Sequence, residues 1–511
     1  MPKNPSIKKN FVLNAILTIS NILFPIISYP YVARILGPSG TGEVDFAASI
    51  ISYFSLFAQL GIPTYGIRAC AKVRDNKLEL SRTVWELMSI NIVMSLIAYM
   101  VFIPVLFFVP QISSEKPLFI IVSITLFLNA LGIEHLYRGL EQYSYITIRS
   151  IVFKFIAFIA MFLLIKQKED YVIYGAITIF AGSASNILNF IHARKIIGFK
   201  NIGKLNWKRH MSPIVLFFAM NCATTIYLNL DTSMLGFIAS KKDVGYYGAA
   251  VKVKKIMVSL VTSLGVVLLP RASYYVEQGR MDEFRNITHK ALKFVFVISA
   301  PLMVFFMCFA KESVLFLSGI SYSAAVPAMV VIMPTLLFIG ITNILGIQVL
   351  VPLGKEKYVL YSEIAGAIID LILNAIFIPK LKSTGAAIGT VVAELVVLIV
   401  QYILLFKIRD KNPIVDSFKK IKYWKMLIAI SLAIPASIWV KYAGIKVAFG
   451  STINRMLMTH NLCLLAIEGV CFFLTYGIIM IILKDDMILE ILNTVIGKAK
   501  SIAARKGLKR S

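Results

Sequence analysis

The chain has 511 residues, of which 58% are hydrophobic and only 15% are charged, and its formal net charge is +27. Because a soluble domain usually contains about a quarter charged residues, this composition excludes a soluble globular protein. The lysines and arginines lie in short segments between apolar runs, so the charge indicates membrane topology and argues against nucleic-acid binding.

Apolar runs of about 20 residues recur from one end of the chain to the other. Each is long enough to cross about 30 Å of hydrocarbon as an α-helix, which satisfies its own backbone hydrogen bonds in lipid. β-Barrel strands would be about half as long and would alternate apolar with polar residues. The pattern predicts an all-α membrane protein with about fourteen transmembrane helices, at 11–33, 44–67, 85–109, 118–138, 147–166, 171–192, 212–238, 243–270, 291–310, 324–350, 359–378, 382–406, 425–443 and 460–483.

The basic residues of the connecting segments set the predicted orientation. With the N-terminus in the cytoplasm, lysines and arginines inside outnumber those outside by roughly three to one. This ratio predicts a multi-pass protein of the bacterial cytoplasmic (inner) membrane with both termini in the cytoplasm. The external segments are all short, and 485–511 is predicted to be an amphipathic basic tail on the cytoplasmic surface.

Two hairpins of the chain resemble each other. One runs from Arg34-Ile-Leu-Gly37 through a polar turn to Gly42-Glu-Val-Asp-Phe-Ala-Ala48, and the other runs from Met234-Leu-Gly236 to Val244-Gly-Tyr-Tyr-Gly-Ala-Ala250. Both begin on the same predicted side of the membrane, so they predict two parallel six-helix repeats with a central cavity between them. The predicted organisation is an N-terminal lobe at 1–210, a C-terminal lobe at 211–410, an appended helix pair at 411–484, and the tail.

Three motifs near the start of the chain carry a family resemblance. They are Tyr31-Val-Ala-Arg-Ile-Leu-Gly-Pro-Ser-Gly40, Leu60-Gly-Ile-Pro-Thr-Tyr-Gly-Ile-Arg68, and Arg138-Gly-Leu-Glu-Gln-Tyr143 followed by Ile146-Thr-Ile-Arg149. The sequence therefore resembles the oligosaccharide flippases of the Wzx type, within the multidrug/oligosaccharidyl-lipid/polysaccharide exporter superfamily. The resemblance implies two six-helix lobes and a lipid-linked oligosaccharide cargo, an undecaprenyl-pyrophosphate-linked repeat unit. It also implies a groove for the lipid tail near the last two spans.

Five basic residues in or beside predicted spans are candidates for binding such a cargo in the cavity. A charge inside an apolar span costs roughly 2.5 kcal/mol or more, so each needs a partner, water or a function. Lys252 and Lys255 share one helical face with Ser259 and would attract a pyrophosphate, whereas snorkelling or pairing with a neighbouring helix is the alternative. The other candidates, with similar alternatives, are Arg34, Arg149 and Lys154.

Arg68, Lys72 and Arg74 flank the predicted inner mouth of the cavity. They are candidates for capturing the pyrophosphate before flipping, and contact with anionic lipid head groups is the alternative explanation. Amides within the spans suit either sugar hydroxyls or hydrogen bonds between helices, and they are Asn14, Asn21, Gln59, Asn129 and Asn221.

Four acidic residues within predicted spans are candidates for binding a coupling proton or Na⁺. Glu363 and Asp370 lie seven residues apart and so share a helical face, and Glu394 lies in the following span. Asp231 is either such a group or the partner of a lysine on the next span, which would hold two helices together. A lysine partner would likewise neutralise Glu363 or Asp370.

The sequence shows no catalytic motif, because its five histidines are scattered and no HExxH, P-loop or nucleophile elbow occurs. It predicts a transporter and not an enzyme, with no cofactor, metal or nucleic-acid partner. By alternating access it would flip the repeat unit for capsule, O-antigen or exopolysaccharide synthesis. Its candidate partners are the cargo, membrane lipid, a coupling proton or Na⁺, a polymerase and other polysaccharide-assembly proteins.

Three alternative functions stay open at this point. A multidrug cation antiporter would need an acidic cavity, whereas this sequence offers several lysines, and a lipid II flippase would use the same architecture. A membrane polysaccharide polymerase or ligase would need a sizeable external loop with reactive groups, which the short predicted loops do not supply.

Overall fold

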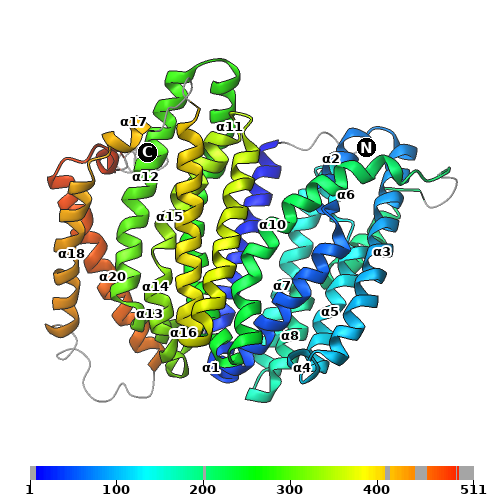
Figure 1. Cartoon of the computed structure of the whole chain (residues 1–511), viewed down its shortest axis with the longest axis horizontal. Helices are drawn as coiled ribbons and strands as arrows, with labels where there is room; N and C mark the ends of the chain where they lie inside the picture. The colour runs from blue at the N-terminus through cyan, green and yellow to red at the C-terminus, as the bar shows by residue number, and fades with distance from the viewer. Residues whose placement is uncertain (1–6, 199–202, 409–414, 444–456, 491, 494–511) are drawn as a thin grey trace, which may run out of the picture. The chain divides into compact units, whose positions relative to one another are not determined.

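The computed structural model describes residues 7–198, 203–408, 415–443, 457–490 and 492–493 of the chain. These residues form helices and connecting turns without a strand, which confirms the predicted all-α class (Figure 1). The chain divides into two compact units. Unit 1 comprises Met1–Ala249, Ile320–Ala324 and Asp370–Gly389, and unit 2 comprises Ala250–Gly319, Ala325–Ile369 and Thr390–Ser511.

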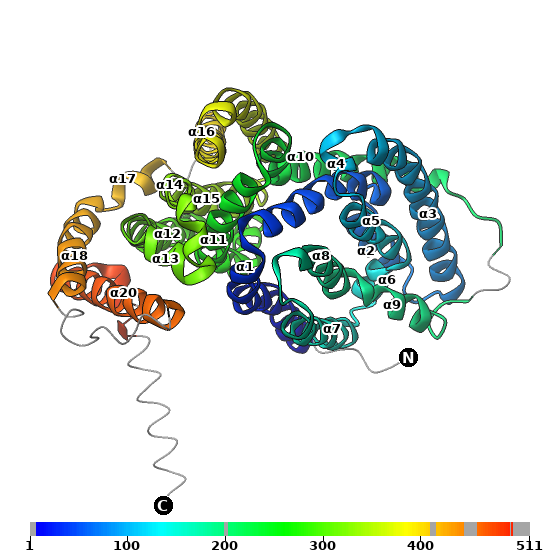
Figure 2. The same cartoon turned by 90° about the horizontal axis from the view of Figure 1, so that it is seen from below.

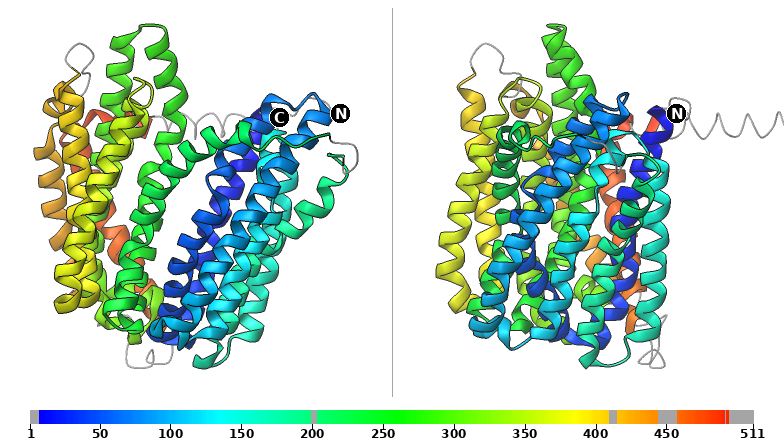
Figure 3. Two further views of the ribbon diagram at one scale, coloured as in Figure 1. Left: turned by 45° about the vertical axis from the view of Figure 1, so that its right-hand side comes forward. Right: turned by 90° about the vertical axis from the view of Figure 1, so that its right-hand side faces the viewer.

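Unit 1 holds the N-terminal helices and α10. In chain order its elements are α1 (Ile7–Gln59), α2 (Ile62–Lys72), α3 (Lys77–Phe108), α4 (Pro110–Ser113), α5 (Lys116–Leu131), α6 (Glu134–Gly139), α7 (Tyr143–Leu164), η1 (Lys168–Asp170), α8 (Tyr171–Ile179), η2 (Phe180–Ala184), α9 (Asn186–Ala193), α10 (Lys208–Ile238) and the beginning of α11 (Lys241–Glu277). Within this unit α1 packs against α3, α5, α7 and α10 (Figures 2 and 3).

Unit 2 holds the later helices. They are the rest of α11, α12 (Met281–Cys308), α13 (Ala310–Ser318), α14 (Val326–Ile332), α15 (Thr335–Asn343), η4 (Ile344–Leu350), α17 (Val415–Lys420), α18 (Tyr423–Ala443) and α20 (Leu457–Ile482). The short η3 (Ile320–Ala325) begins in unit 1. The long α16 (Glu356–Phe406) contributes its middle to unit 1 and its two ends to unit 2.

The core of unit 2 is aromatic and aliphatic. Phe305, Phe309 and Phe472 are buried, and the ring of Phe305 lies 4.9 Å from that of Phe309 and 5.4 Å from that of Phe472. These contacts join α12 to α20, and α18 packs along α20 (Figure 1). The helices of the predicted C-terminal pair therefore share the core of unit 2.

Both of the longest helices contain a break in their backbone geometry. Gly37 in α1 has φ 67° and ψ −178°, and Lys382 in α16 has φ 51°. Glycine adopts positive φ without steric cost, which explains the break at the polar turn predicted between the first two spans. Pro38 directly follows Gly37, and Pro379 precedes Lys382 by one turn, so each break sits beside a helix-disrupting residue.

The described residues contain eight helices long and apolar enough to cross a membrane, or up to ten if each bent pair is one span. The predicted total of about fourteen is not confirmed. The difference has two sources: α1 and α16 each cover two predicted spans, one on either side of the break, and two other apolar helices, at 116–131 and 423–439, are short. The predicted division into lobes and the predicted orientation stay predictions, and most of the predicted tail lies outside the described residues.

Candidate functional site

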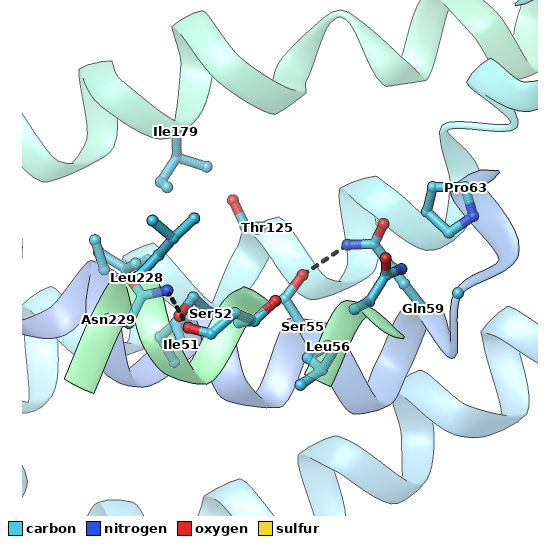
Figure 4. Close-up of a pocket in the computed structure, with 15 residues that line it drawn as sticks. Ile51, Ser52, Ser55, Leu56, Gln59, Pro63, Thr125, Ile179, Leu228 and Asn229 are labelled. Carbon is cyan, nitrogen blue, oxygen red and sulfur yellow. Dashed lines mark hydrogen bonds between the residues drawn. The ribbon is translucent and has the colours of Figure 1, made fainter. Parts of the chain in front are cut away.

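Unit 1 contains a partly open cavity of about 440 Å³ between its helices (Figure 4). It is lined by α1, α5, α8 and α10, together with the turn that leads into α2. No charged side chain is found among the described residues that line it. We call it the α1–α10 cavity, and its polar lining residues are Ser52, Ser55, Gln59, Thr125, Asn221, Thr225 and Asn229.

Helical periodicity puts the polar lining on one face of each main helix. The lining positions on α1 follow the spacing i, i+3, i+7, and those on α10 follow i, i+4, i+8. The two helices come close at one end of the cavity, where Gly61 has φ 76°. A Cβ atom at Gly61 would lie 2.6 Å from the backbone nitrogen of Phe218, so only glycine permits this close approach.

Some of the polar groups in the cavity are already paired and others are not. The amide of Gln59 donates to the hydroxyl of Ser55 at 2.7 Å, and the amide of Asn229 donates to the backbone carbonyl of Thr225 at 2.9 Å (Figure 4). Asn221 is half-buried, and its side-chain amide makes no hydrogen bond with the described residues. The cavity therefore offers hydrogen-bonding capacity that the protein itself does not use.

A second polar site in unit 1 is deeply buried and carries carboxylates. Asp231 on α10 and Asp370 on α16 are 7% and 1% exposed, and Asn374 lies one turn after Asp370 and is fully buried. The amide of Asn374 donates to Oδ1 of Asp231 at 2.7 Å, and the hydroxyl of Tyr247 donates to Oδ2. We call these four residues the acidic cluster.

Two observations connect Asp370 to the same cluster. A Cβ atom on Gly389 would lie 3.0 Å from Oδ1 of Asp370 and 3.1 Å from the Cγ atom of Asn374, so both side chains reach the Gly389 backbone. Tyr53 on α1 interacts electrostatically with both Asp231 and Asp370. The fold thus brings together two of the acids that the sequence selected, and adds Asn374 and Tyr247, which it did not.

The basic candidates of unit 1 lie in different surroundings. Lys154 is half-buried on α7 and donates to the hydroxyl of Ser20 at 3.1 Å and to the amide oxygen of Asn21, both on α1. Arg34 donates to the carbonyl of Pro30 at 2.6 Å. In these contacts the acceptors of both cations are neutral oxygen atoms.

Arg149 is placed differently from Lys154. Its side chain is 5% exposed, lies 3.6 Å from the carboxylate of Glu134 and donates to the backbone carbonyl of Ser185 at 3.2 Å. Its guanidinium also lies 6.0 Å from the ring centre of Tyr145. This environment supports a role in joining α7 to its neighbours more than a role in cargo binding.

The three candidates for an inner mouth are exposed, on and just beyond α2. Arg68 and Lys72 lie one turn apart on this helix, and Arg74 follows its end. Arg74 lies 3.5 Å from the carboxylate of Glu141. The three residues form an exposed basic surface, and their role at an inner mouth stays a prediction.

The remaining candidates belong to unit 2. Lys252 is half-buried and Lys255 exposed on α11, while Glu363 is half-buried and Glu394 is buried on α16. Each of the four takes part in at least one polar or electrostatic interaction. Their assignments to cargo and ion binding stay predictions.

The structure also shows a buried network that the sequence did not indicate. Glu86 on α3 is fully buried and accepts hydrogen bonds from the backbone of Asn206 at 2.6 Å, from Arg209 at 2.6 and 2.8 Å and from His210 at 2.7 Å. Tyr65 contacts the other ring nitrogen of His210 at 2.8 Å. This network fixes the beginning of α10, and no signal revealed it because Glu86 and its partners lie far apart in the sequence.

The two hairpins that predicted a repeat meet inside unit 1. A Cβ atom on Gly42 would lie 2.8 Å from the backbone nitrogen of Gly245, so the two turns touch through glycine. Lys241 lies 3.6 Å from the carboxylate of Glu43 and 3.5 Å from the ring centre of Phe46. The contact joins the beginning of α11 to the second half of α1.

Comparison with known families and sequences places the chain among transport-related proteins. Residues 7–276 match the family described as polysaccharide biosynthesis protein, and residues 217–376 match the MatE family. Two relatives bear the name "Putative O-antigen transporter". The one from Escherichia coli K12 is 25% identical over 77% of this chain and 95% of its own length, and the one from Shigella dysenteriae is 26% identical over 78% and 99%.

Two solved structures share the fold. The lipid II flippase MurJ in an inward closed conformation matches with a TM-score of 0.67 at 17% identity, over 93% of this chain and all of that one. An inward-facing multidrug resistance transporter of the MATE family matches with a TM-score of 0.61 at 14% identity, over 78% of this chain and 98% of that one. At these identities the likeness concerns the fold and leaves the cargo open.

Proposed function

The chain belongs to the polysaccharide biosynthesis protein family, and from this premise we propose that it flips an undecaprenyl-pyrophosphate-linked oligosaccharide repeat unit across the bacterial cytoplasmic membrane. The names of its relatives support the cargo class, because both are named as O-antigen transporters. The product would serve O-antigen, capsule or exopolysaccharide synthesis.

The observation that carries this proposal is the α1–α10 cavity. It lies among helices that are apolar enough to cross a membrane, yet its lining offers amides and hydroxyls. Polar groups inside membrane helices are costly unless water, another helix or a ligand satisfies them. A carrier for a hydrophilic glycan needs such groups, because they replace the water that the glycan loses as it crosses.

The pyrophosphate of the cargo would be held by the basic residues. Lys154 and Arg34 are candidates for this role, because both are cations on helices of unit 1 and both donate hydrogen bonds to oxygen acceptors on α1. Lys252 and Lys255 on α11 are the further candidates, and Arg68, Lys72 and Arg74 would collect the anion at the surface of α2. Lysine and arginine are the side chains that bind phosphate most strongly in proteins.

Coupling to an ion is assigned to the acidic cluster. Asp231 and Asp370 are both buried, and burial favours binding of a proton or a cation at a carboxylate. Asp231 receives donors from Asn374 and Tyr247, and the carbonyl oxygen of Asn374 has no hydrogen-bond partner among the described residues. We propose that a proton or Na⁺ binds here, and that its binding shifts the balance between two conformations.

Deletion of the gene tests the proposal against its main alternatives. Loss of a flippase should leave unpolymerised lipid-linked units on the cytoplasmic leaflet, and a plasmid copy should restore surface polysaccharide. Accumulation of single units on the outer leaflet would point instead to a polymerase or ligase. Normal polysaccharide with increased sensitivity to cationic drugs would point to a multidrug antiporter, and arrested peptidoglycan synthesis to a lipid II flippase.

A further inference from the structure

We infer that the α1–α10 cavity is a carbohydrate subsite, which binds a neutral sugar ring of the cargo and does not bind its pyrophosphate. This inference rests on the proposed function and deepens it, because it names the part of the cargo that this cavity recognises. It separates cargo binding into two sites of different chemistry: neutral groups for the glycan and cations for the pyrophosphate.

The chemistry of the lining excludes ions as the natural ligand. Its polar side chains are amides and hydroxyls, and the described lining contains neither a cation nor a carboxylate. A pyrophosphate would need lysine or arginine, and a cationic drug would need an acid. A sugar hydroxyl both donates and accepts hydrogen bonds, and amide and hydroxyl side chains do the same.

Unused hydrogen-bonding groups point into this cavity. The half-buried amide of Asn221 makes no hydrogen bond with the described residues, although it lies in a helix that crosses the membrane. The amide of Gln59 uses its nitrogen on Ser55, and its oxygen remains an acceptor. A ligand rich in hydroxyls would supply hydrogen-bond partners to these half-buried groups.

The apolar part of the lining suits the rest of a sugar ring. Leu228 on α10 and Ile179 on α8 face the cavity, and the buried Ile51 on α1 lies behind its polar wall (Figure 4). A pyranose has C–H groups on its faces and hydroxyls around its edge, so a cavity with both kinds of wall matches it. The volume of about 440 Å³ falls within the range of about 300–1,000 Å³ that is usual for small-molecule sites.

The test compares two lipids binding to the purified full-length protein. One is the lipid-linked repeat unit extracted from the deletion strain, and the other is undecaprenyl pyrophosphate, which carries no sugar. The double variant Gln59→Leu, Asn221→Leu removes the two amides, and Thr125→Val is a milder change that keeps the side-chain shape. Gln111→Leu, at an exposed position on α4, is the matched control.

The inference expects the wild type and Gln111→Leu to bind the repeat unit more tightly than undecaprenyl pyrophosphate. The double variant should lose about ten-fold in affinity for the repeat unit, from two neutral hydrogen bonds, and Thr125→Val should lose less. Binding of undecaprenyl pyrophosphate should be unchanged in every variant, which also shows that the variants are folded. Equal binding of the repeat unit by the wild type and the double variant would overturn the inference alone. Failure of the wild type to bind either lipid would overturn the proposed function and the inference with it.

Discussion

The α1–α10 cavity and the acidic cluster lie in the same unit and share α10, yet they differ in how their polar groups are satisfied. In the cavity the groups are half-buried and neutral, and Asn221 makes no hydrogen bond with the described residues. In the acidic cluster they are buried, and Asn374 and Tyr247 donate directly to Asp231. On the function proposed above, α10 would therefore bind a large neutral ligand along one part of its length and a small cation or proton along another.

The largest expected effect concerns the acidic cluster. The double variant Asp231→Asn, Asp370→Asn keeps the size of both side chains and removes the charges that would bind the coupling ion. We expect surface polysaccharide to fall by about 100-fold or more at a normal protein level, as when ligands of bound ions are disturbed. Export at the wild-type rate would contradict the assignment, and Asp282→Asn, at an exposed position, is the control.

The Glu86 network differs from both the cavity and the acidic cluster, because its polar groups pair with one another. We therefore expect its loss to affect stability and not ligand binding. Glu86→Gln removes a buried charge that accepts from Arg209 and His210, and should lower the free energy of unfolding by about 2 kcal/mol. Thermal unfolding of the purified protein measures this. Glu141→Gln, at a more exposed carboxylate, should change stability little. A loss of export without a loss of stability would show that the network does more than hold α10.

A smaller effect is expected from the cations of α11. Lys252→Gln together with Lys255→Gln should lower export about ten-fold, which corresponds to one lost charge-assisted hydrogen bond to the pyrophosphate. Lys254→Gln on the same helix is the matched control, since Lys254 points away from the face that Lys252 and Lys255 share. Unchanged export at a normal protein level would show that these two lysines do not bind the cargo.

The smallest effect is expected within the cavity itself. The amide of Asn229 is already paired with the carbonyl of Thr225, so Asn229→Leu should change the affinity for the lipid-linked repeat unit by less than about two-fold. Asn221→Leu should cost more, because its amide is available to the cargo. If the two variants lose the same affinity for the repeat unit, a hydrogen bond within the protein does not decide which amides bind sugar.

Several features could be predicted from the sequence because they depend on local pattern. The length and apolarity of the runs predicted an all-α membrane protein, and the turn at Gly37 lies where the sequence placed it. Glu363 and Asp370 share a helical face, but this did not predict that they belong to different units. Asp370 lies in unit 1 and Glu363 lies in unit 2. Periodicity identifies a face of a helix, but not the helix that covers it.

Other features depend on contacts between segments that are distant in the sequence, and they could not be predicted from it. Glu86 meets Arg209 and His210, and Asn374 meets Asp231, across more than a hundred residues in each case. Arg149 was selected as a candidate for cargo binding in the cavity, but nothing in the sequence showed that Glu134 lies beside it. Amides such as Gln59 and Asn221 were recognisable as polar groups in spans, and only the fold shows that they line one cavity.

The most direct test of the central claim uses the full-length protein reconstituted into liposomes with the lipid-linked repeat unit. A membrane-impermeant enzyme that degrades the glycan on the outer leaflet reports how fast the inner-leaflet pool becomes accessible. The account predicts that the protein makes this pool accessible, and that Asp231→Asn with Asp370→Asn abolishes the acceleration given by an ion gradient. An inner-leaflet pool that stays protected in the presence of folded wild-type protein, with every gradient of protons or Na⁺ applied, would contradict it.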